Sequence, residues 1–171
     1  MKTILTIHEQ DINPDAPVVD YDKFGTRQAA RAVVYDQKGA VALLHVGLYD
    51  YHKLPGGGID KGEDIASALT RELLEEIGCI AEVMGELGKI IEYRDQLELR
   101  QTSYCFTAKQ IGKKGRPSFT AKEIRELFSI VWSDNIDSAI KLIEQDKPTN
   151  YQGHFIQKRD LAMLKAAKEL R

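Results

Sequence analysis

The stretch LPGGGIDKGEDIASALTRELLEEIGC, residues 54–79, is the most informative part of the chain. Glu72, Glu75 and Glu76 are spaced i, i+3 and i+4, which puts three carboxylates on one face of a helix. Like charges that close repel by roughly 0.2–0.5 kcal/mol per pair, so a fold gains nothing from them without a cation. A hard divalent cation such as Mg²⁺ prefers oxygen ligands. The spacing therefore predicts a helix, over about Glu63 to Ile77, that holds Mg²⁺.

A glycine-rich loop, residues 54–58, leads into this helix. Glycine lets the backbone approach a ligand closely, and amides near a helix start favour phosphate oxygens. A carbonyl in such a loop can also ligate a metal. Glu63 and Asp64 are expected in the first turn, where negative charge suits the helix dipole, and Gly78 fits a C-cap. The loop, the helix and its end therefore agree with a site for a metal and a phosphate.

Residues 57–79 resemble the Nudix box, G-x5-E-x7-R-E-U-x-E-E-x-G-U, in which U is a bulky apolar residue. Every fixed position matches. The soft position is the last one, where Cys79 replaces the usual aliphatic residue, and a buried free cysteine behaves as a small hydrophobe. The alternative is an ordinary glutamate-rich helix with a solvated face. That alternative requires Gly57, Arg71 and Gly78 to match the pattern by chance as well.

The resemblance implies a Nudix hydrolase, which uses water to cleave a nucleoside diphosphate linked to another group X. Glu72, Glu75 and Glu76 would be both the catalytic carboxylates and the metal ligands, with the Gly56 carbonyl as a further ligand. The implied cofactor is Mg²⁺, for which Mn²⁺ could substitute. Any of the three glutamates could also accept the proton of the attacking water.

Two further pairs of charged residues belong to this interpretation. Arg71 and Glu63 are expected to pair and to hold the loop against the helix, which is a structural role. In some members of the family, a carboxylate in the loop before the last strand completes the metal site. Glu123 and Glu126 are the candidates here, and Glu123 is assigned as the catalytic one. The alternative for both is an ordinary surface glutamate.

Substrate contacts are predicted for Arg31, His52 and Lys53. His52 and Lys53 directly precede the glycine loop and could contact a phosphate or a base, with a plain surface role as the alternative. Arg31, like the nearby Arg27, lies close to the first strand and could contact phosphates. Salt bridges are the favoured alternative for these two arginines.

Patterns along the rest of the chain predict a fold of the α/β class. The apolar runs 29–35 and 40–46 flank a turn signal and predict a hairpin. The other predicted elements are strands at 80–93, 97–108 and 127–132, a loop at 109–122, and helices at 135–144 and 152–170. Helices on both faces of a central sheet define the class, and the resemblance implies the Nudix α/β/α sandwich with a mixed β-sheet. Arg159 and Asp160 are expected to form a surface or interhelix ion pair.

The composition predicts one domain over residues 1–171. Hydrophobic residues make up 43% and charged residues 29%, which is ordinary for a globular protein. A net charge of −2 indicates no general nucleic-acid surface. Cys79 and Cys105 lie in apolar stretches and are expected to be reduced. No apolar run suits a signal peptide or a membrane span, so the predicted location is the cytoplasm.

Markers outside the box narrow the expected substrate. The proline typical of the ADP-ribose group is missing from residues 94–96, and the motifs of the NADH and coenzyme A groups are absent. The remaining resemblance is to small MutT-like members, which convert a nucleoside triphosphate, canonical or oxidised, to the monophosphate and pyrophosphate. ADP-ribose or another nucleotide sugar is the alternative substrate, and a non-catalytic nucleotide-sensing module is the alternative class. The expected partner is a small nucleotide, and a homodimer is a further possibility.

Overall fold

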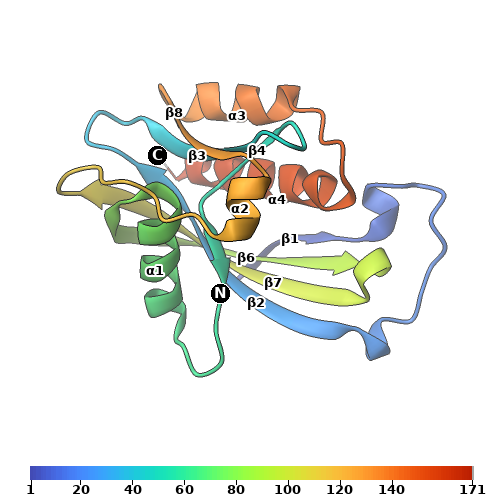
Figure 1. The fold of residues 1–171 in the computed structure, drawn as a ribbon. Coiled ribbons are helices and arrows are strands. Elements are labelled where there is room, and N and C mark those ends of the chain that lie inside the picture. Colours follow the sequence, from blue (N-terminus) through green and yellow to red (C-terminus); the bar gives the residue numbers. More distant parts are fainter. Residues whose placement is uncertain (171) are drawn as a thin grey trace.

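A computed structural model describes residues 1–170, which form a mixed β-sheet with helices packed on both faces (Figure 1). The strands are β1 (Thr3–Ile7), β2 (Gly25–Tyr35), β3 (Val41–Val46), β4 (Tyr51–Lys53), β5 (Gly56–Gly58), β6 (Ile80–Arg94), β7 (Leu99–Ile111) and β8 (Phe128–Ser133). The helices are α1 (Ile65–Ile77), α2 (Ala121–Arg125), α3 (Ile136–Gln145) and α4 (Tyr151–Glu169). Short 3-10 turns lie at Glu9–Asp11, Tyr21–Lys23 and Asp95–Leu97.

The sheet combines parallel and antiparallel pairs. Its strands lie in the order β1-β6-β7-β2-β3-β4, with β5 paired to β2 and β8 paired to β3. The β1–β6 and β2–β7 pairs are parallel, whereas the β6–β7, β2–β5 and β3–β8 pairs are antiparallel. The expected α/β class with a mixed sheet is therefore confirmed.

The side chains of β2 alternate between two hydrophobic cores. Ala30, Ala32 and Val34 pack with the buried residues of α1. Val33 points to the opposite face and packs with the buried residues of α3 and α4. This alternation follows from the two-residue period of a strand, and it places α1 on one face of the sheet and α3 with α4 on the other.

Helix α1 has a defined cap at each end. The Asp64 carboxylate accepts a hydrogen bond from Ser67 N at 2.9 Å and so caps the start of the helix. Asp64 is therefore the N-cap, and the helix begins at Ile65 rather than at Glu63. Gly78 ends the helix with φ of 61°, which confirms the predicted glycine C-cap.

The predicted hairpin of residues 29–35 and 40–46 forms at its turn and then opens. The Asp36 carboxylate accepts two backbone N–H bonds, at 2.8 and 2.9 Å, that close the turn. Tyr35 and Val41 form the one β2–β3 pair in the ladder of residues 1–170. Beyond that pair, β5 occupies the edge of β2, and β3 pairs with β4 and β8 instead. The predicted hairpin is therefore confirmed only at its turn, because the glycine loop itself forms a strand that pairs with the rest of β2.

Four elements lie outside the predicted set: β1, β4, β5 and α2. Strands β4 and β5 have three residues each, and α2 has five, so none of them contains a readable hydrophobic period. Helix α2 begins inside the predicted loop 109–122, and β7 extends into that loop as far as Ile111. Strand β1 is mostly partly exposed and depends on pairing with β6.

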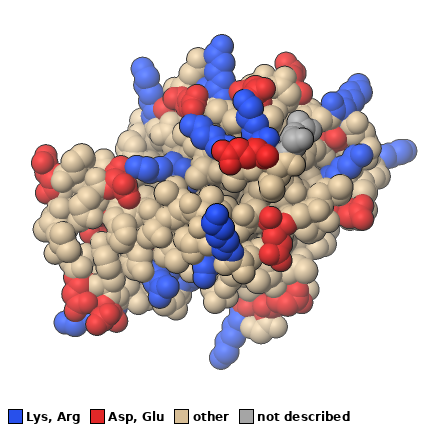
Figure 2. Space-filling view, turned by 180° about the vertical axis from the view of Figure 1, so that it is seen from behind, with Lys and Arg blue, Asp and Glu red and all other residues tan. Residues whose placement is uncertain are grey.

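The surface carries charges of both signs. Figure 2 shows acidic and basic side chains interspersed over the face opposite to that of Figure 1. Cys79 and Cys105 are buried free cysteines, as expected. Within residues 1–170, no helix combines the length and the apolar character needed to cross a lipid bilayer.

Candidate functional site

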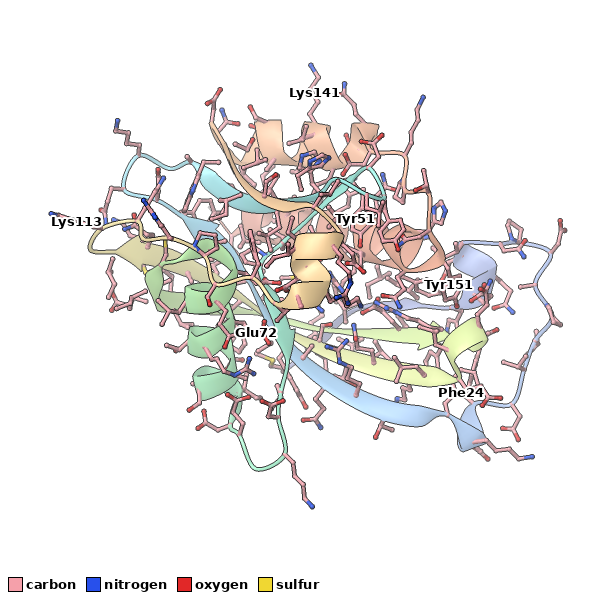
Figure 3. The ribbon with its side chains drawn as sticks, in the orientation of Figure 1. Phe24, Tyr51, Glu72, Lys113, Lys141 and Tyr151 are labelled. Atoms are coloured by element: carbon pink, nitrogen blue, oxygen red, sulfur yellow. The ribbon has the colours of Figure 1, made fainter. Side chains whose placement is uncertain are left out.

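The glycine loop and α1 fit together at Gly57. The Glu72 carboxylate lies so close that a Cβ added at Gly57 would come within 2.4 Å of its carbon and both oxygens. In Figure 3, Glu72 lies between α1 and the sheet. A side chain at Gly57 would therefore displace this carboxylate from the loop.

Glu76 is the buried carboxylate of the stretch. One of its oxygens accepts a hydrogen bond from Lys53 Nζ at 2.6 Å, and the other accepts one from Gly56 N at 2.7 Å. Burial raises the pKa of Glu76, and the neighbouring Lys53 ammonium opposes this shift. The site therefore already holds one cationic group against a buried carboxylate.

Gly56, whose N–H binds Glu76, also places its backbone carbonyl in the site. Its φ is 126°, and a Cβ there would lie 2.3 Å from the Ala30 carbonyl oxygen, so both conformation and space require glycine. The Gly56 carbonyl accepts a hydrogen bond from Arg31 Nη1 at 2.6 Å. Its second lone pair leaves it able to ligate a metal as well. Burial lowers the pKa of Arg31 to about 10.

Arg71 links the loop to the helix. Its guanidinium donates to both carboxylate oxygens of Glu63, at 3.0 and 2.9 Å, and to the Gly58 carbonyl at 2.9 Å. It also donates to Glu72 at 2.8 Å and, over a longer distance of 3.4 Å, to Glu75. The expectation that Arg71 and Glu63 pair and hold the loop against the helix is confirmed.

The carboxylates of α1, the glycine loop and Arg71 line one polar cavity of ≈ 330 Å³. It is lined by Glu72, Glu75 and Glu76, named below the box glutamates, and by the three glycines of β5. Glu123 and Glu126 of α2 line it as well. A larger hollow of ≈ 750 Å³, among Tyr35, Met84 and Leu170, contains none of these carboxylates.

The two candidate carboxylates of α2 have their own partners. The Glu123 carboxylate accepts a hydrogen bond from Thr120 N at 2.7 Å and forms a capping box. Glu126 Oε1 lies 3.8 Å from Lys122 Nζ. Both residues are partly exposed and line the cavity. Glu123 and Glu126 therefore line the same cavity as the box glutamates, while each keeps a partner within or next to α2.

The donor set of this cavity fits a hard divalent cation. Within residues 1–170, no three acidic, histidine or cysteine side chains enclose a metal position as they stand. Lys53 Nζ instead donates to one oxygen of Glu76, and Arg71 Nη1 donates to one oxygen of Glu72. The Lys53 ammonium, 2.6 Å from Glu76, marks a place where the site accepts a positive charge. Once the Lys53 side chain turns aside, the box glutamates, including the second oxygen of Glu72, and the Gly56 carbonyl offer the oxygen ligands that Mg²⁺ prefers.

The predicted substrate contacts divide between two places. Lys53 and Arg31 line the cavity, and His52 is not among the lining residues. His52 Nδ1 lies 2.9 Å from Asp146 Oδ1, and His52 N donates to the other oxygen of that carboxylate at 2.6 Å. His52 therefore joins β4 to the end of α3 and does not line the cavity of the box glutamates.

The salt bridges favoured for Arg27 and Arg31 are not formed. Neither arginine belongs to an ion pair within residues 1–170, where the paired arginines are Arg71, Arg94 and Arg159. Arg27 Nη1 donates instead to the neutral Gln101 side chain at 3.1 Å. Arg31 donates to the Gly56 carbonyl, as described above.

Four residues beside the cavity were not predicted from the sequence to lie there. Arg159 and Asp160 form the expected ion pair, with Arg159 Nε 2.7 Å from Asp160 Oδ1, but both residues are fully buried and do not lie at the surface. The Asp160 carboxylate also accepts a hydrogen bond from Leu54 N at 2.7 Å. Arg94 and Gln101 are also buried and line the cavity. The sequence does carry polar residues at alternate positions of two strands. That these residues share one face can be recognised only when the pairing of the strands is known.

Known proteins resemble this chain in sequence and in fold. Residues 25–148 match the family model described as NUDIX domain. Diphosphoinositol polyphosphate phosphohydrolase 2 of Rattus norvegicus is 27% identical over 135 residues, which cover 76% of this chain and 70% of that protein. A crystal structure of a MutT protein from Methanosarcina mazei Go1 aligns with a TM-score of 0.58 and 14% identity, over 87% of this chain and 98% of its own. A crystal structure of a UDP-X diphosphatase aligns with a TM-score of 0.58 and 18% identity, over 94% of this chain and 69% of its own.

The family-model match and the phosphohydrolases among the similar proteins show a hydrolase that acts on phosphoric anhydride bonds. The chain belongs to the Nudix family, because the family model covers more than half of its length. Members of this family generally use divalent metal cations and act on small nucleotide substrates. The resemblance found in residues 57–79 is thereby confirmed.

Proposed function

We propose that this protein is a Mg²⁺-dependent pyrophosphohydrolase that cleaves a nucleoside diphosphate linked to another group X. One observation carries the proposal: the box glutamates, the Gly56 loop and several cationic side chains line a single cavity. Carboxylates suit the cation, and ammonium and guanidinium groups suit the phosphates. Phosphoryl transfer needs this combination, since positioning and charge neutralisation dominate its catalysis.

The residues of the cavity would have different roles when a water molecule attacks the phosphorus atom. When bound, Mg²⁺ neutralises phosphate oxygens and lowers the pKa of a bound water. The water oxygen forms a bond to phosphorus, the bond to the bridging oxygen breaks, and that oxygen leaves with the departing phosphate. A box glutamate, or Glu123 on α2, accepts the proton of the water. Lys53 would hold the oxygens of the phosphoryl group under attack, and Arg31 would contact another phosphate of the substrate.

The substrate we infer is a nucleoside triphosphate, canonical or oxidised, which yields the monophosphate and pyrophosphate. Support comes from the missing ADP-ribose proline at residues 94–96 and from the cationic lining of the cavity. ADP-ribose and other nucleotide sugars are the alternative substrates. The arginines of the cavity and the rat relative's name also make a diphosphoinositol polyphosphate a candidate. A non-catalytic nucleotide-sensing module is disfavoured, because all three box glutamates are present.

The cytoplasm is the location we propose. Cys79 and Cys105 are buried thiols without a disulfide. Burial raises the pKa of both, which keeps them protonated and unreactive. Such thiols suit a reducing compartment. A homodimer stays a prediction, which gel filtration with light scattering would test.

Hydrolysis of a substrate panel tests the proposal. The full chain is incubated with nucleoside triphosphates, oxidised purine triphosphates, ADP-ribose and diphosphoinositol polyphosphate, with Mg²⁺, Mn²⁺ or excess EDTA, in ¹⁸O-labelled water. We expect hydrolysis with either metal and none with EDTA, and a triphosphate should give the monophosphate and pyrophosphate. Activity that persists in excess chelator would contradict the proposed metal-dependent hydrolysis. A kcat/KM for ADP-ribose about tenfold above that of every triphosphate would overturn the substrate ranking.

A further inference from the structure

Four arginines gather on the wall of the cavity that the sheet and α4 form. Arg27 and Arg31 come from β2, Arg94 from β6 and Arg159 from α4. These four residues are named here the arginine cluster. Figure 1 shows β2, β7 and β6 side by side, and α4 contacts both β2 and β6.

Strand pairing explains why side chains so distant in sequence meet. Arg27 of β2 is paired with Gln101 of β7, which in turn is paired with Glu92 of β6. Because alternate residues of a strand share a face, Arg31 lies on the same side as Arg27, and Arg94 on the same side as Glu92. This is the face that α4 covers, and α4 adds Arg159 to it.

Among residues 1–170, two buried carboxylates form ion pairs with arginines of the cluster. Glu92 accepts a hydrogen bond from Arg94 Nη2 at 2.6 Å, and its other oxygen lies 3.7 Å from Arg159 Nη1. Asp160 accepts hydrogen bonds from Arg159 Nε at 2.7 Å and Nη2 at 3.1 Å. Four guanidinium groups against two carboxylates leave an excess of positive charge on this wall.

Three buried N–H groups of the cluster have no hydrogen-bond acceptor within residues 1–170. They are Arg31 Nε, Arg94 Nε and Arg159 Nη1, on side chains of residues that are 5%, 4% and 0% exposed. A buried charged donor without an acceptor is costly. The nearby Glu76 does not remove this cost, because Lys53 and Gly56 already occupy its oxygens. The described chain therefore leaves the cluster short of an anion.

We propose that the arginine cluster binds a phosphoryl group other than the diphosphate held at the box glutamates. Guanidinium groups match phosphate oxygens in geometry and in charge. Arg31 adjoins the Gly56 carbonyl, and the cluster extends from there to β6 and α4. The inference rests on the proposed function, and it narrows the substrate to one that carries at least one further phosphoryl group. Inorganic phosphate or pyrophosphate released by the reaction would supply the same chemistry.

Phosphate binding without a divalent metal tests the cluster apart from catalysis. Inorganic phosphate is titrated into the full chain in excess EDTA by calorimetry. We expect binding by the wild type and by Arg100→Gln, which changes an exposed arginine of β7. The affinity of Arg94→Gln should fall by about tenfold or more. No binding by the wild type, or unchanged affinity in Arg94→Gln, would overturn the inference. Phosphate binding in a chain that hydrolyses no substrate would contradict the proposed function alone.

Kinetics distinguishes the two sources of the phosphoryl group. ATP and ADP-ribose share an ADP moiety and differ in whether X is a phosphoryl group or an uncharged sugar. If the group belongs to the substrate, Arg94→Gln lowers kcat/KM for ATP about tenfold more than for ADP-ribose. If it belongs to the product, the two substrates change alike and inhibition by pyrophosphate weakens. Equal kinetics together with unchanged inhibition would contradict both arms.

A second variant separates a ligand site from a structural network. Arg31 bonds to a carbonyl and to no carboxylate within residues 1–170, so Arg31→Gln strands no anionic partner. We expect its melting temperature without phosphate to equal or exceed that of the wild type, and the rise caused by phosphate to shrink. A lower melting temperature with the rise intact would mark Arg31 as a structural residue and count against the inference.

Discussion

At the scale of single residues, the pairing of Lys53 with Glu76 governs the cavity in its metal-free form. The two side chains are 11% and 4% exposed, so their attraction is little screened by water. A divalent cation that binds Glu76 must first displace the Lys53 ammonium. The displaced ammonium would then be free to meet a phosphate oxygen.

Replacing Lys53 is therefore expected to strengthen metal binding. Lys53→Met removes the competing cation, so its affinity for Mn²⁺ should rise by roughly tenfold, which corresponds to about 1.4 kcal/mol. Titration followed by electron paramagnetic resonance measures free Mn²⁺ directly. Lys61→Met, which changes an exposed lysine of the loop before α1, should bind Mn²⁺ as the wild type does. Unchanged or weaker binding by Lys53→Met would show that the two cations do not compete.

The charge of Glu76 is expected to act mainly on turnover. Glu76→Gln keeps the size of the side chain, and its kcat should fall by about 10²–10³ because a charge that stabilises the transition state is lost. Glu82→Gln, at an exposed position of β6, should leave kcat unchanged. Circular dichroism checks that the fold survives. Near-normal turnover in Glu76→Gln would show that α1 does not hold the catalytic cation.

At the scale of elements, α1 and the glycine loop form one unit through Arg71. Its guanidinium binds Glu63 in the loop before the helix, Gly58 in β5 and Glu72 on the helix itself. These bonds fix β5 beside α1, and β5 is in turn paired with β2. The position of the Gly56 carbonyl relative to the box glutamates therefore depends on this arginine.

The Glu63–Arg71 bond predicts a loss of stability in acid. The Arg71 hydrogen bonds, followed by that from Asp60 N, lower the pKa of Glu63 below its ordinary value of 4.5. A lowered pKa adds stability that is present above the unfolded-state pKa and is lost as the pH falls through the folded-state pKa. Urea unfolding from pH 6 down to about pH 3 should therefore show a shallower loss of stability for Glu63→Gln than for the wild type. Parallel curves for the two proteins would contradict this prediction.

The elements differ in how far their residues allow prediction. The helix of the box could be predicted with its C-cap, because Arg71, Gly78 and the glutamates lie within one short segment. Strand β5 could not be predicted, because three consecutive glycines are typical of a loop. They form a strand here only through their pairing with β2. The arginine cluster joins positions from 27 to 159 through the register of three strands and one helix. Such long-range register leaves no local pattern in a single sequence.

At the scale of the whole molecule, the fold joins two unlike sites in one cavity. The box glutamates come from the helix on one face of the sheet, and the arginine cluster comes from the other face and the helix that covers it. Strand β5 and the residues before it lie between them, because Gly56 contacts both Glu76 and Arg31. A substrate lying across this point would meet metal at one end and guanidinium groups at the other.

The two ends of the cavity should respond separately to their ligands. A ligand that binds the folded chain at about 100 times its Kd adds about 2.7 kcal/mol of stability, which for a chain of this length raises the melting temperature by about 5–10 °C. We expect Mg²⁺ alone, and phosphate in EDTA alone, each to raise the melting temperature of the wild type. Glu76→Gln should lose most of the Mg²⁺ effect and keep the phosphate effect, and Arg94→Gln should do the reverse, so that each variant serves as the control for the other. If either variant lost both effects equally, the cavity would act as one indivisible site, and its division into a metal end and a phosphate end would fail.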